Sequence, residues 1–153
     1  MKKAFQDNYA DDFNHCYGCG ALNEHGLKIK SYWDGEESVA HFTPREYHTA
    51  VPGFVYGGLI ASLIDCHSTG TGAAALFKES GENGNYPRCV TASLHVDYIK
   101  PTPIDCELEL RGKVKKIDGR KVTVLVDLIA KGKVCAKGKV MVMSVPEGWK
   151  PKF

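Results

Sequence analysis

The chain has 153 residues, of which 43% are hydrophobic and 25% are charged, and its formal net charge at pH 7 is +2. These values are ordinary for one globular domain, and they argue against a fibrous repeat, a disordered chain and bulk nucleic-acid binding. We therefore expect a single domain, residues 1–153, with no nucleic acid as a partner.

No window of the sequence approaches the roughly 18 apolar residues that a membrane-spanning helix needs. The first three residues lead into acidic, polar sequence instead of the apolar core of a signal peptide. Six cysteines are present, but a chain of this length needs no disulfide framework, so we interpret them as reduced thiols. We expect a soluble, cytoplasmic protein without a membrane partner.

The N-terminal segment, residues 1–25, is polar and is interpreted as an irregular lead-in to the domain. It contains the run Cys16-Tyr17-Gly18-Cys19, with His15 and His25 nearby. This run provides one of the two ligand pairs that a typical zinc site has. A second Cys-x-x-Cys or a His pair at finger spacing is missing, and the glycine equally suits a tight turn. We therefore predict no metal and no cofactor.

Residues 26–33 and 37–43 alternate apolar and polar side chains on either side of an Asp34-Gly35 turn pair. Such alternation predicts two strands joined as a hairpin. A connecting stretch, residues 44–56, leads from this hairpin to the next element.

A helix is predicted from Gly57 to about residue 79, because the apolar residues recur at helical spacing. The segment is rich in small residues, among them Gly70 and Gly72, and a glycine inside a helix costs about 1 kcal/mol relative to alanine. Another part of the protein must therefore pack very close to this helix. A turn-rich loop, residues 80–87, ends it.

The remainder of the chain alternates in the manner of strands. In the segment 90–98 we expect the apolar residues on one face of the strand and the polar residues on the other. The apolar face would hold Val90, Ala92, Leu94, Val96 and Tyr98, and the polar face Thr91, Ser93, His95 and Asp97. Short turns at 118–119 and 131–133 join three further strands as antiparallel neighbours. A hairpin, one long helix and a meander predict an α+β domain whose curved sheet buries the helix.

Asp65 is the one carboxylate between Leu59 and Phe77 of the predicted helix. An unpaired buried carboxylate is costly, so such an acid is either paired or functional. It would act as general base for water or attack a carbonyl as a nucleophile, and the spacing does not separate the two. The hydroxyls of Ser68 and Thr69 could orient the carboxylate or a water molecule. The alternative is a bond to their own helix backbone, which is favoured for Ser68.

Gly57 and Gly58 open the helix, where the first backbone N–H groups lack helical partners and the positive end of the helix dipole lies. This end suits a developing oxyanion, although glycines there equally allow a tight entry and close packing. Asp65 lies eight residues beyond Gly57, or roughly 12 Å along a helix. Because one carbonyl needs both groups within about 4 Å, the spacing predicts a two-fold dimer in which Gly57 of one subunit faces Asp65 of the other.

These motifs resemble the hotdog-fold thioesterases of the phenylacetate-pathway (PaaI) type. The resemblance runs from Cys16-Tyr17-Gly18-Cys19-Gly20, through residues 48–58 and Asp65, to residues 91–103. It implies a hotdog fold, in which a curved antiparallel sheet wraps around one long central helix. It also implies hydrolysis of an acyl-CoA or acyl-pantetheine thioester by a homodimer, often assembled as a dimer of dimers.

By the same resemblance, Gly57 looks like the oxyanion-hole glycine of the family, Asp65 like its catalytic acid and Thr69 like an assisting hydroxyl. His48 matches a histidine that often begins the loop before the helix, and it is a candidate substrate-binding residue.

The remaining substrate-binding candidates are Tyr56, Gly58 and Ser68. The family usually has histidine before the glycine pair, and this chain has Tyr56 there. A tyrosine hydroxyl can donate to a thioester carbonyl, but it does not titrate near neutral pH as histidine does.

Two other functions stay open. A hotdog protein could bind acyl-CoA without hydrolysing it, with Tyr56 as the sign of lost catalysis. Hydration or dehydration of an acyl thioester needs an Asp and a His together in similar folds, and His48 is the plausible partner of Asp65. His67 lies two residues after Asp65, points elsewhere on the helix, and is interpreted as a packing residue.

Overall fold

The structure is a computed structural model that describes residues 2–152. Two short 3-10 helices, η1 (Phe5–Asn8) and η2 (Asp11–Phe13), precede a hairpin of β1 (Ser31–Asp34) and β2 (Glu37–Phe42). The long helix α1 (Gly57–Glu79) is followed by β3 (Arg88–Tyr98), β4 (Leu108–Asp118), β5 (Lys121–Ala130) and β6 (Lys133–Val145). Within the described part of the chain, no helix is both long and apolar enough to cross a membrane.

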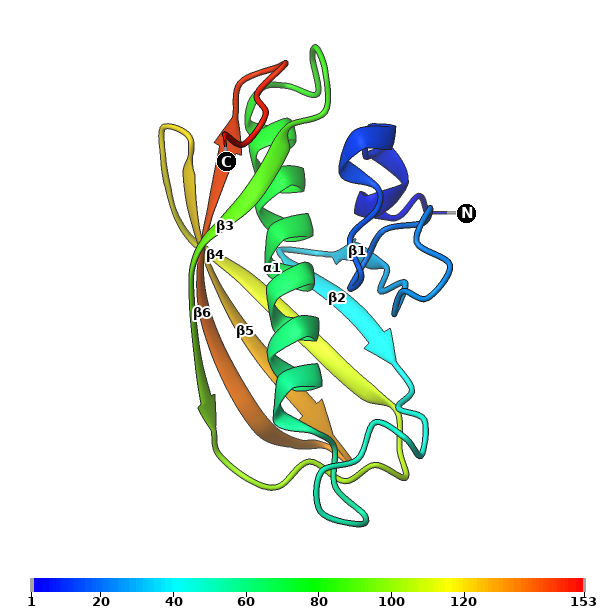
Figure 1. Cartoon of the computed structure of the whole chain (residues 1–153). Coiled ribbons are helices and arrows are strands. Elements are labelled where there is room, and N and C mark those ends of the chain that lie inside the picture. Colours follow the sequence, from blue (N-terminus) through cyan, green and yellow to red (C-terminus); the bar gives the residue numbers. More distant parts are fainter. Residues whose placement is uncertain (1, 153) are drawn as a thin grey trace.

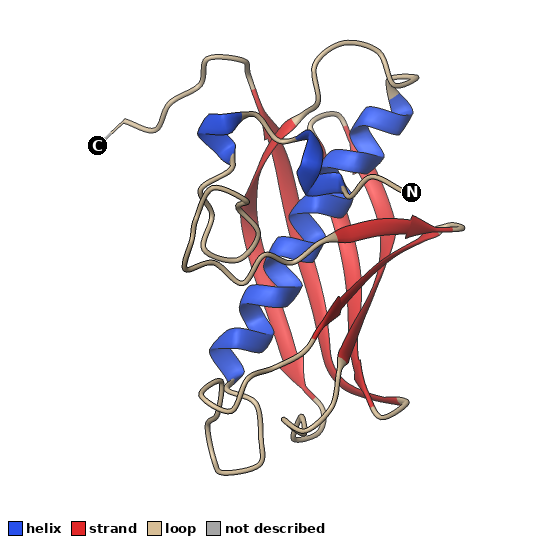
Figure 2. Ribbon diagram, turned by 90° about the vertical axis from the view of Figure 1, so that its right-hand side faces the viewer, coloured by secondary structure: helices blue, strands red, loops and turns tan. Residues whose placement is uncertain are grey.

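One six-stranded antiparallel sheet, in the order β1-β2-β4-β5-β6-β3, curves around α1. The helix lies against the concave face of the sheet, and the lead-in lies on the other side of the helix (Figure 1, Figure 2). Leu63 and Ile64 of α1 pack with inward-facing residues of β4, β5 and β6 in one hydrophobic core. The predicted α+β architecture, a curved sheet around a single long helix, is confirmed.

The small residues of α1 and of the sheet let the two layers approach closely. A Cβ atom added to Gly72 would lie 2.8 Å from Val142 Cγ1, and one added to Gly138 of β6 would lie 2.3 Å from Ile64 Cγ2. On the opposite side of the helix, a Cβ at Gly70 would lie 2.8 Å from the side-chain nitrogen of Gln6. The expected close packing is therefore present, from the sheet and from the lead-in.

Gly138→Ala is expected to destabilise the protein by about 1–3 kcal/mol, because the added methyl group overlaps a core isoleucine. A lower midpoint of urea unfolding with an unchanged m-value would report this loss. Ile64→Leu moves the branch of the side chain away from the overlap, so the double variant should recover part of the stability. A Gly138→Ala midpoint equal to that of the wild type would show that the helix is free to shift.

The first strand is shorter than predicted. Residues 27–30 contact the lead-in instead of extending the hairpin: the N–H of Leu27 donates to the Tyr17 carbonyl at 2.7 Å, and the N–H of Ile29 to the Gly18 carbonyl at 3.1 Å. Lys28 between them has a positive φ of 56°, which interrupts an extended strand. The hairpin itself is confirmed, with β1 beginning at Ser31.

Strand β3 does not alternate as predicted, because a bulge interrupts it between Thr91 and Ser93. Thr91 pairs with Val142 and Leu94 pairs with Val140, and both valines are fully buried in the core. Since directly paired residues share a face of the sheet, Thr91 and Leu94 both lie on the helix side. The predicted separation of Thr91 from the apolar face of this strand is therefore wrong.

His67 is fully buried between the helix and the first hairpin. Its Nδ1 lies 2.9 Å from Ser31 Oγ and its Nε2 lies 3.0 Å from Ser38 Oγ, so both ring nitrogens are hydrogen-bonded. Burial lowers the pKa of His67 to about 3. The interpretation of His67 as a packing residue is confirmed.

Candidate active site

The carboxylate of Asp65 points from the middle of α1 toward the start of β3. Thr91 Oγ1 donates a hydrogen bond to Asp65 Oδ1 at 2.5 Å, and Thr69 Oγ1 lies 3.1 Å from Thr91 Oγ1. Because Thr91 gives its one proton to Asp65, it accepts from Thr69, whose proton is shared with the Asp65 backbone carbonyl at 3.0 Å. Two hydroxyls thus form a chain that ends on the carboxylate.

The environment of Asp65 favours a proton-accepting carboxylate. The residue is partly buried, and burial raises its pKa, while the hydrogen bond from Thr91 opposes this shift. One carboxylate oxygen is held by Thr91, and the carboxylate borders a cavity. This arrangement suits proton abstraction from a water molecule or direct attack on a carbonyl carbon.

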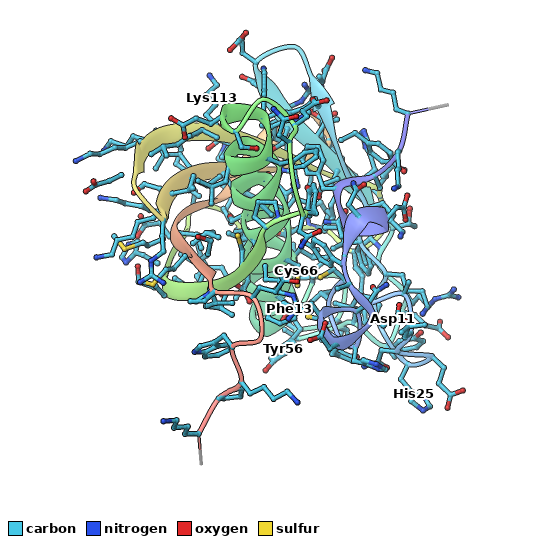
Figure 3. All side chains as sticks on the ribbon, turned by 90° about the horizontal axis from the view of Figure 1, so that it is seen from above. Asp11, Phe13, His25, Tyr56, Cys66 and Lys113 are labelled. Carbon is cyan, nitrogen blue, oxygen red and sulfur yellow. The ribbon has the colours of Figure 1, made fainter. Side chains whose placement is uncertain are left out.

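A cavity of about 250 Å³ opens beside Asp65, and three separate parts of the chain form its walls. The lead-in, the middle of α1 and the start of β3 each contribute to the lining. Phe13 of the lead-in and Cys66 of the helix, both labelled in Figure 3, line this cavity. The lead-in, which the sequence analysis left without a function, is one wall of the candidate site.

A wider depression of about 580 Å³ lies on the outer face of the sheet and is lined by charged residues that include Arg111, Asp127 and Lys139. It does not include Asp65, Thr69 or Thr91. We therefore place the candidate chemistry in the smaller cavity, where an acid and two hydroxyls converge.

Three thiols cluster in the same cavity: Cys16 and Cys19 from the lead-in, and Cys66 from α1. Their Sγ atoms all lie within 4.8 Å of one another. Hydrogen bonds from the thiols of Cys19 and Cys66 lower the pKa of Cys16, and the same contacts with Cys16 raise the pKa values of the other two. Cys16 is therefore the thiol of the cluster that loses its proton most readily. All six cysteines of the chain are free.

The helix begins at Gly57 with Tyr56 as its N-cap residue, and the Tyr56 side chain makes no capping hydrogen bond. The N–H groups of Gly57 and Gly58 are first-turn donors without helical acceptors. The Tyr98 hydroxyl donates to the Gly57 carbonyl at 2.7 Å and holds the end of β3 against this turn. Because α1 is unbroken, Gly57 and Asp65 stay roughly 12 Å apart along the axis.

Two other candidates lie outside the lining of the Asp65 cavity. His48 Nδ1 accepts a hydrogen bond from the Arg45 N–H at 2.9 Å, within its own loop. Ser68 is fully buried, and among residues 2–152 its hydroxyl has no hydrogen-bond partner. The helix-backbone bond expected for Ser68 is therefore wrong, and Thr69 makes such a bond instead.

Thr91 is the residue of the site that the sequence analysis missed. Strict alternation placed it on the polar face of its strand, away from the helix. The bulge after Thr91 reverses that placement and brings its hydroxyl to Asp65. Thr91 does begin the segment 91–103 that carries the family resemblance, which was the one available signal.

The family model for the Thioesterase superfamily matches residues 52–137, more than half of the chain. The chain belongs to the thioesterase superfamily. The matched range contains Gly57, Asp65, Thr69 and Thr91.

Two curated relatives cover parts of the chain. Acyl-coenzyme A thioesterase THEM4 of Xenopus laevis is 44% identical over 84 residues, which are 55% of this chain and 33% of that protein. THEM4 of Mus musculus is 36% identical over 126 residues, which are 81% of this chain and 48% of that protein. The chain spans less than half of the length of these relatives.

Solved structures support the same family. A thioesterase superfamily protein from Shewanella loihica PV-4 is 46% identical, with a TM-score of 0.70 over 90% of this chain and 100% of that chain. The PaaI protein of the E. coli phenylacetic acid degradation operon has a TM-score of 0.65 over 78% of this chain and 81% of that chain. At 15% identity, the PaaI likeness shows the fold alone. The hotdog fold and the predicted thioesterase family are confirmed.

Proposed function

We propose that this protein hydrolyses an acyl-CoA or acyl-pantetheine thioester. The observation that supports this proposal most directly is the Asp65 carboxylate. It accepts a hydrogen bond from Thr91 and borders a cavity beside the central helix of a thioesterase-superfamily domain. The names of the THEM4 relatives, acyl-coenzyme A thioesterases, support coenzyme A as the thiol carrier.

In the proposed reaction, Asp65 takes a proton from water while the water oxygen attacks the thioester carbonyl carbon. The carbonyl oxygen becomes an oxyanion, which accepts a hydrogen bond from the Gly57 N–H, with Gly58 as the neighbouring donor. Collapse of the tetrahedral intermediate breaks the carbon–sulfur bond, and protonated Asp65 returns its proton to the leaving thiolate. In the alternative route, the Asp65 carboxylate attacks the carbonyl carbon and expels the thiolate to form a mixed anhydride. Water then opens the anhydride, which releases the acid and restores Asp65.

A homodimer would bring the oxyanion donor Gly57 and the carboxylate of Asp65 to the same thioester. Strand β3 is a sheet edge, and apolar side chains on it and directly after it are exposed: Leu94 41%, Tyr98 54% and Ile99, which follows the strand, 50%. A long apolar edge is normally paired or covered, which supports joining of the two sheets at this strand. The proposed contact places Gly57 of one subunit opposite Asp65 of the other. By family resemblance, two such dimers would assemble into a tetramer.

Tyr56 is proposed to contact the substrate at the oxyanion end of the site. It precedes Gly57 directly, its side chain is 57% exposed, and its hydroxyl can donate to a carbonyl oxygen without a change of charge. A Cβ atom at Gly58 would lie 2.4 Å from the Tyr56 ring, so the glycine also leaves room for this side chain.

The direct test is release of free thiol from a panel of short, long and aromatic acyl-CoAs by the wild-type protein. We expect turnover with at least one acyl class. The alternative function, binding of an acyl-CoA without hydrolysis, is motivated by Tyr56 in place of histidine. Calorimetric binding of an acyl-CoA with no thiol release above the background rate would establish that alternative and reject the hydrolase.

Thr91→Val is expected to lower kcat by about tenfold or more, with a smaller effect on KM. The valine keeps the β-branched shape but removes a hydrogen bond to a charged group, and such bonds contribute about 1.5–3 kcal/mol. Thr91→Ser keeps the hydroxyl and should restore most of kcat, which a purely structural contribution of Thr91 would not predict. Equal losses of kcat in the valine and serine variants would remove the hydroxyl from the mechanism.

A further inference from the structure

The three thiols of the cavity come from two distant parts of the chain. Cys16 and Cys19 lie in one turn of the lead-in, and Cys66 follows Asp65 on α1. The sequence alone shows two potential metal ligands, the Cys-x-x-Cys pair, and no second pair at a suitable spacing. The fold supplies the third sulfur from a residue 47 positions away from Cys19.

The turn that carries the first two thiols is built to sit directly on Cys66. A Cβ atom at Gly18 would lie 2.2 Å from Cys66 Sγ, so a side chain there would push the turn off the helix. A Cβ at Gly20 would lie 2.4 Å from the Cys16 nitrogen, inside the turn itself. The Gly20 N–H also donates to the Cys16 carbonyl at 2.7 Å and closes the turn. Two glycines and a backbone hydrogen bond thus hold both sulfurs against the third.

The sulfur geometry fits ligands of one metal ion. Cys16 Sγ and Cys66 Sγ lie 3.7 Å apart. Two thiolates bound to Zn²⁺ at about 2.3 Å with tetrahedral angles would be about 3.8 Å apart, whereas a disulfide requires about 2.05 Å. All three sulfurs lie within 4.8 Å of one another, so small side-chain movements would bring them to the spacing of ligands of one ion.

We propose that Cys16, Cys19 and Cys66 bind one Zn²⁺ ion as a three-thiolate site. All three cysteines line the cavity, so the fourth position of a tetrahedral ion opens toward the cavity and is filled by water or a ligand. Cys16 is exposed, which provides the entry path for the ion. Binding of the ion displaces the thiol protons to solvent, and the ion links the lead-in to α1. This revises the sequence-based prediction of no metal.

The test uses the full chain, reduced and stripped of metal, with Co²⁺ alone as a spectroscopic probe and no substrate. We expect a sulfur-to-cobalt charge-transfer band and tetrahedral cobalt absorption that saturate at one equivalent and disappear when Zn²⁺ is added. Cys16→Ser changes an exposed ligand and should weaken binding by about 100-fold or more. Cys106→Ser, a cysteine outside the cluster, should bind as the wild type does.

Wild-type protein that develops no charge-transfer band would overturn the proposal whatever the variants do. Binding that survives Cys16→Ser, or that Cys106→Ser abolishes equally, would also overturn it. As a second measurement, Zn²⁺ should raise the melting temperature of the wild type and of Cys106→Ser, but not that of Cys16→Ser. These readouts need no turnover, so they are independent of whether the protein hydrolyses thioesters.

Discussion

Asp65→Asn is expected to lower kcat for thioester hydrolysis by about a thousandfold, because the amide neither accepts a proton from water nor attacks a carbonyl. The asparagine has nearly the shape of the aspartate, and its amide oxygen can still accept the hydrogen bond from Thr91. Folding and substrate binding should therefore change little. The loss should appear in kcat, while KM stays close to the wild-type value.

Asp118→Asn is the matched control for this prediction. It makes the same chemical change at an exposed position at the end of β4, which is not part of the cavity lining. We expect Asp118→Asn to keep wild-type kcat. Unchanged hydrolysis in Asp65→Asn, measured on protein with the wild-type unfolding midpoint, would remove Asp65 from the mechanism.

A single turnover in heavy-oxygen water distinguishes the two forms of Asp65 catalysis. General-base catalysis places the heavy oxygen in the released acid and leaves Asp65 unlabelled. Direct attack forms an anhydride, and water that opens it at the Asp65 carbonyl leaves the label on Asp65 itself. Mass spectrometry of the peptide that contains residue 65 shows whether this peptide carries the heavy oxygen.

The elements that local rules determine were predicted well. The predicted helix agrees with the observed bounds of α1, Gly57–Glu79. The prediction rested on the glycine pair at Gly57, the helical spacing of the apolar residues and the turn-rich loop after residue 79. The Gly119 and Gly132 turns, both with positive φ, determined the meander in the same way. In each case the residues that specify the element lie within it or beside it.

The elements that tertiary contacts determine were not predicted. Strand β1 is short because Leu27 and Ile29 bond to the lead-in, a contact that alternation of residues 26–33 does not reveal. Thr91 reaches Asp65 because of a bulge, and a strict period of two cannot represent an extra residue. Cys66 meets the Cys16-x-x-Cys19 turn only in the folded chain. Asp65 could be singled out from the sequence because an acid within an apolar helical pattern is visible from the neighbouring residues alone.

Gly57→Pro is expected to lower kcat by about 10²–10³-fold, the usual cost of losing one oxyanion donor. Proline is favoured at the first position of a helix, and Tyr56 has the extended φ and ψ of −59° and 131° that a residue before proline requires. The substitution therefore removes an N–H group with little strain. Gly57→Ala keeps the N–H and adds a methyl group 3.5 Å from Tyr98, an ordinary contact, so it should stay active.

Mixing the two inactive variants tests whether the site spans two subunits. In a heterodimer of Asp65→Asn with Gly57→Pro, one site combines the intact Gly57 of the first chain with the intact Asp65 of the second, and the other site has neither. Random exchange makes half of the dimers mixed, each with one working site of two, so the mixture should recover about a quarter of wild-type activity. If each site used Gly57 and Asp65 of one chain, no mixed dimer would contain a working site. The mixture would then be no more active than the average of its parents. Recovery of activity is therefore expected only if each site takes Gly57 from one subunit and Asp65 from the other. The roughly 12 Å that the unbroken α1 keeps between these two residues is the reason to expect such a shared site.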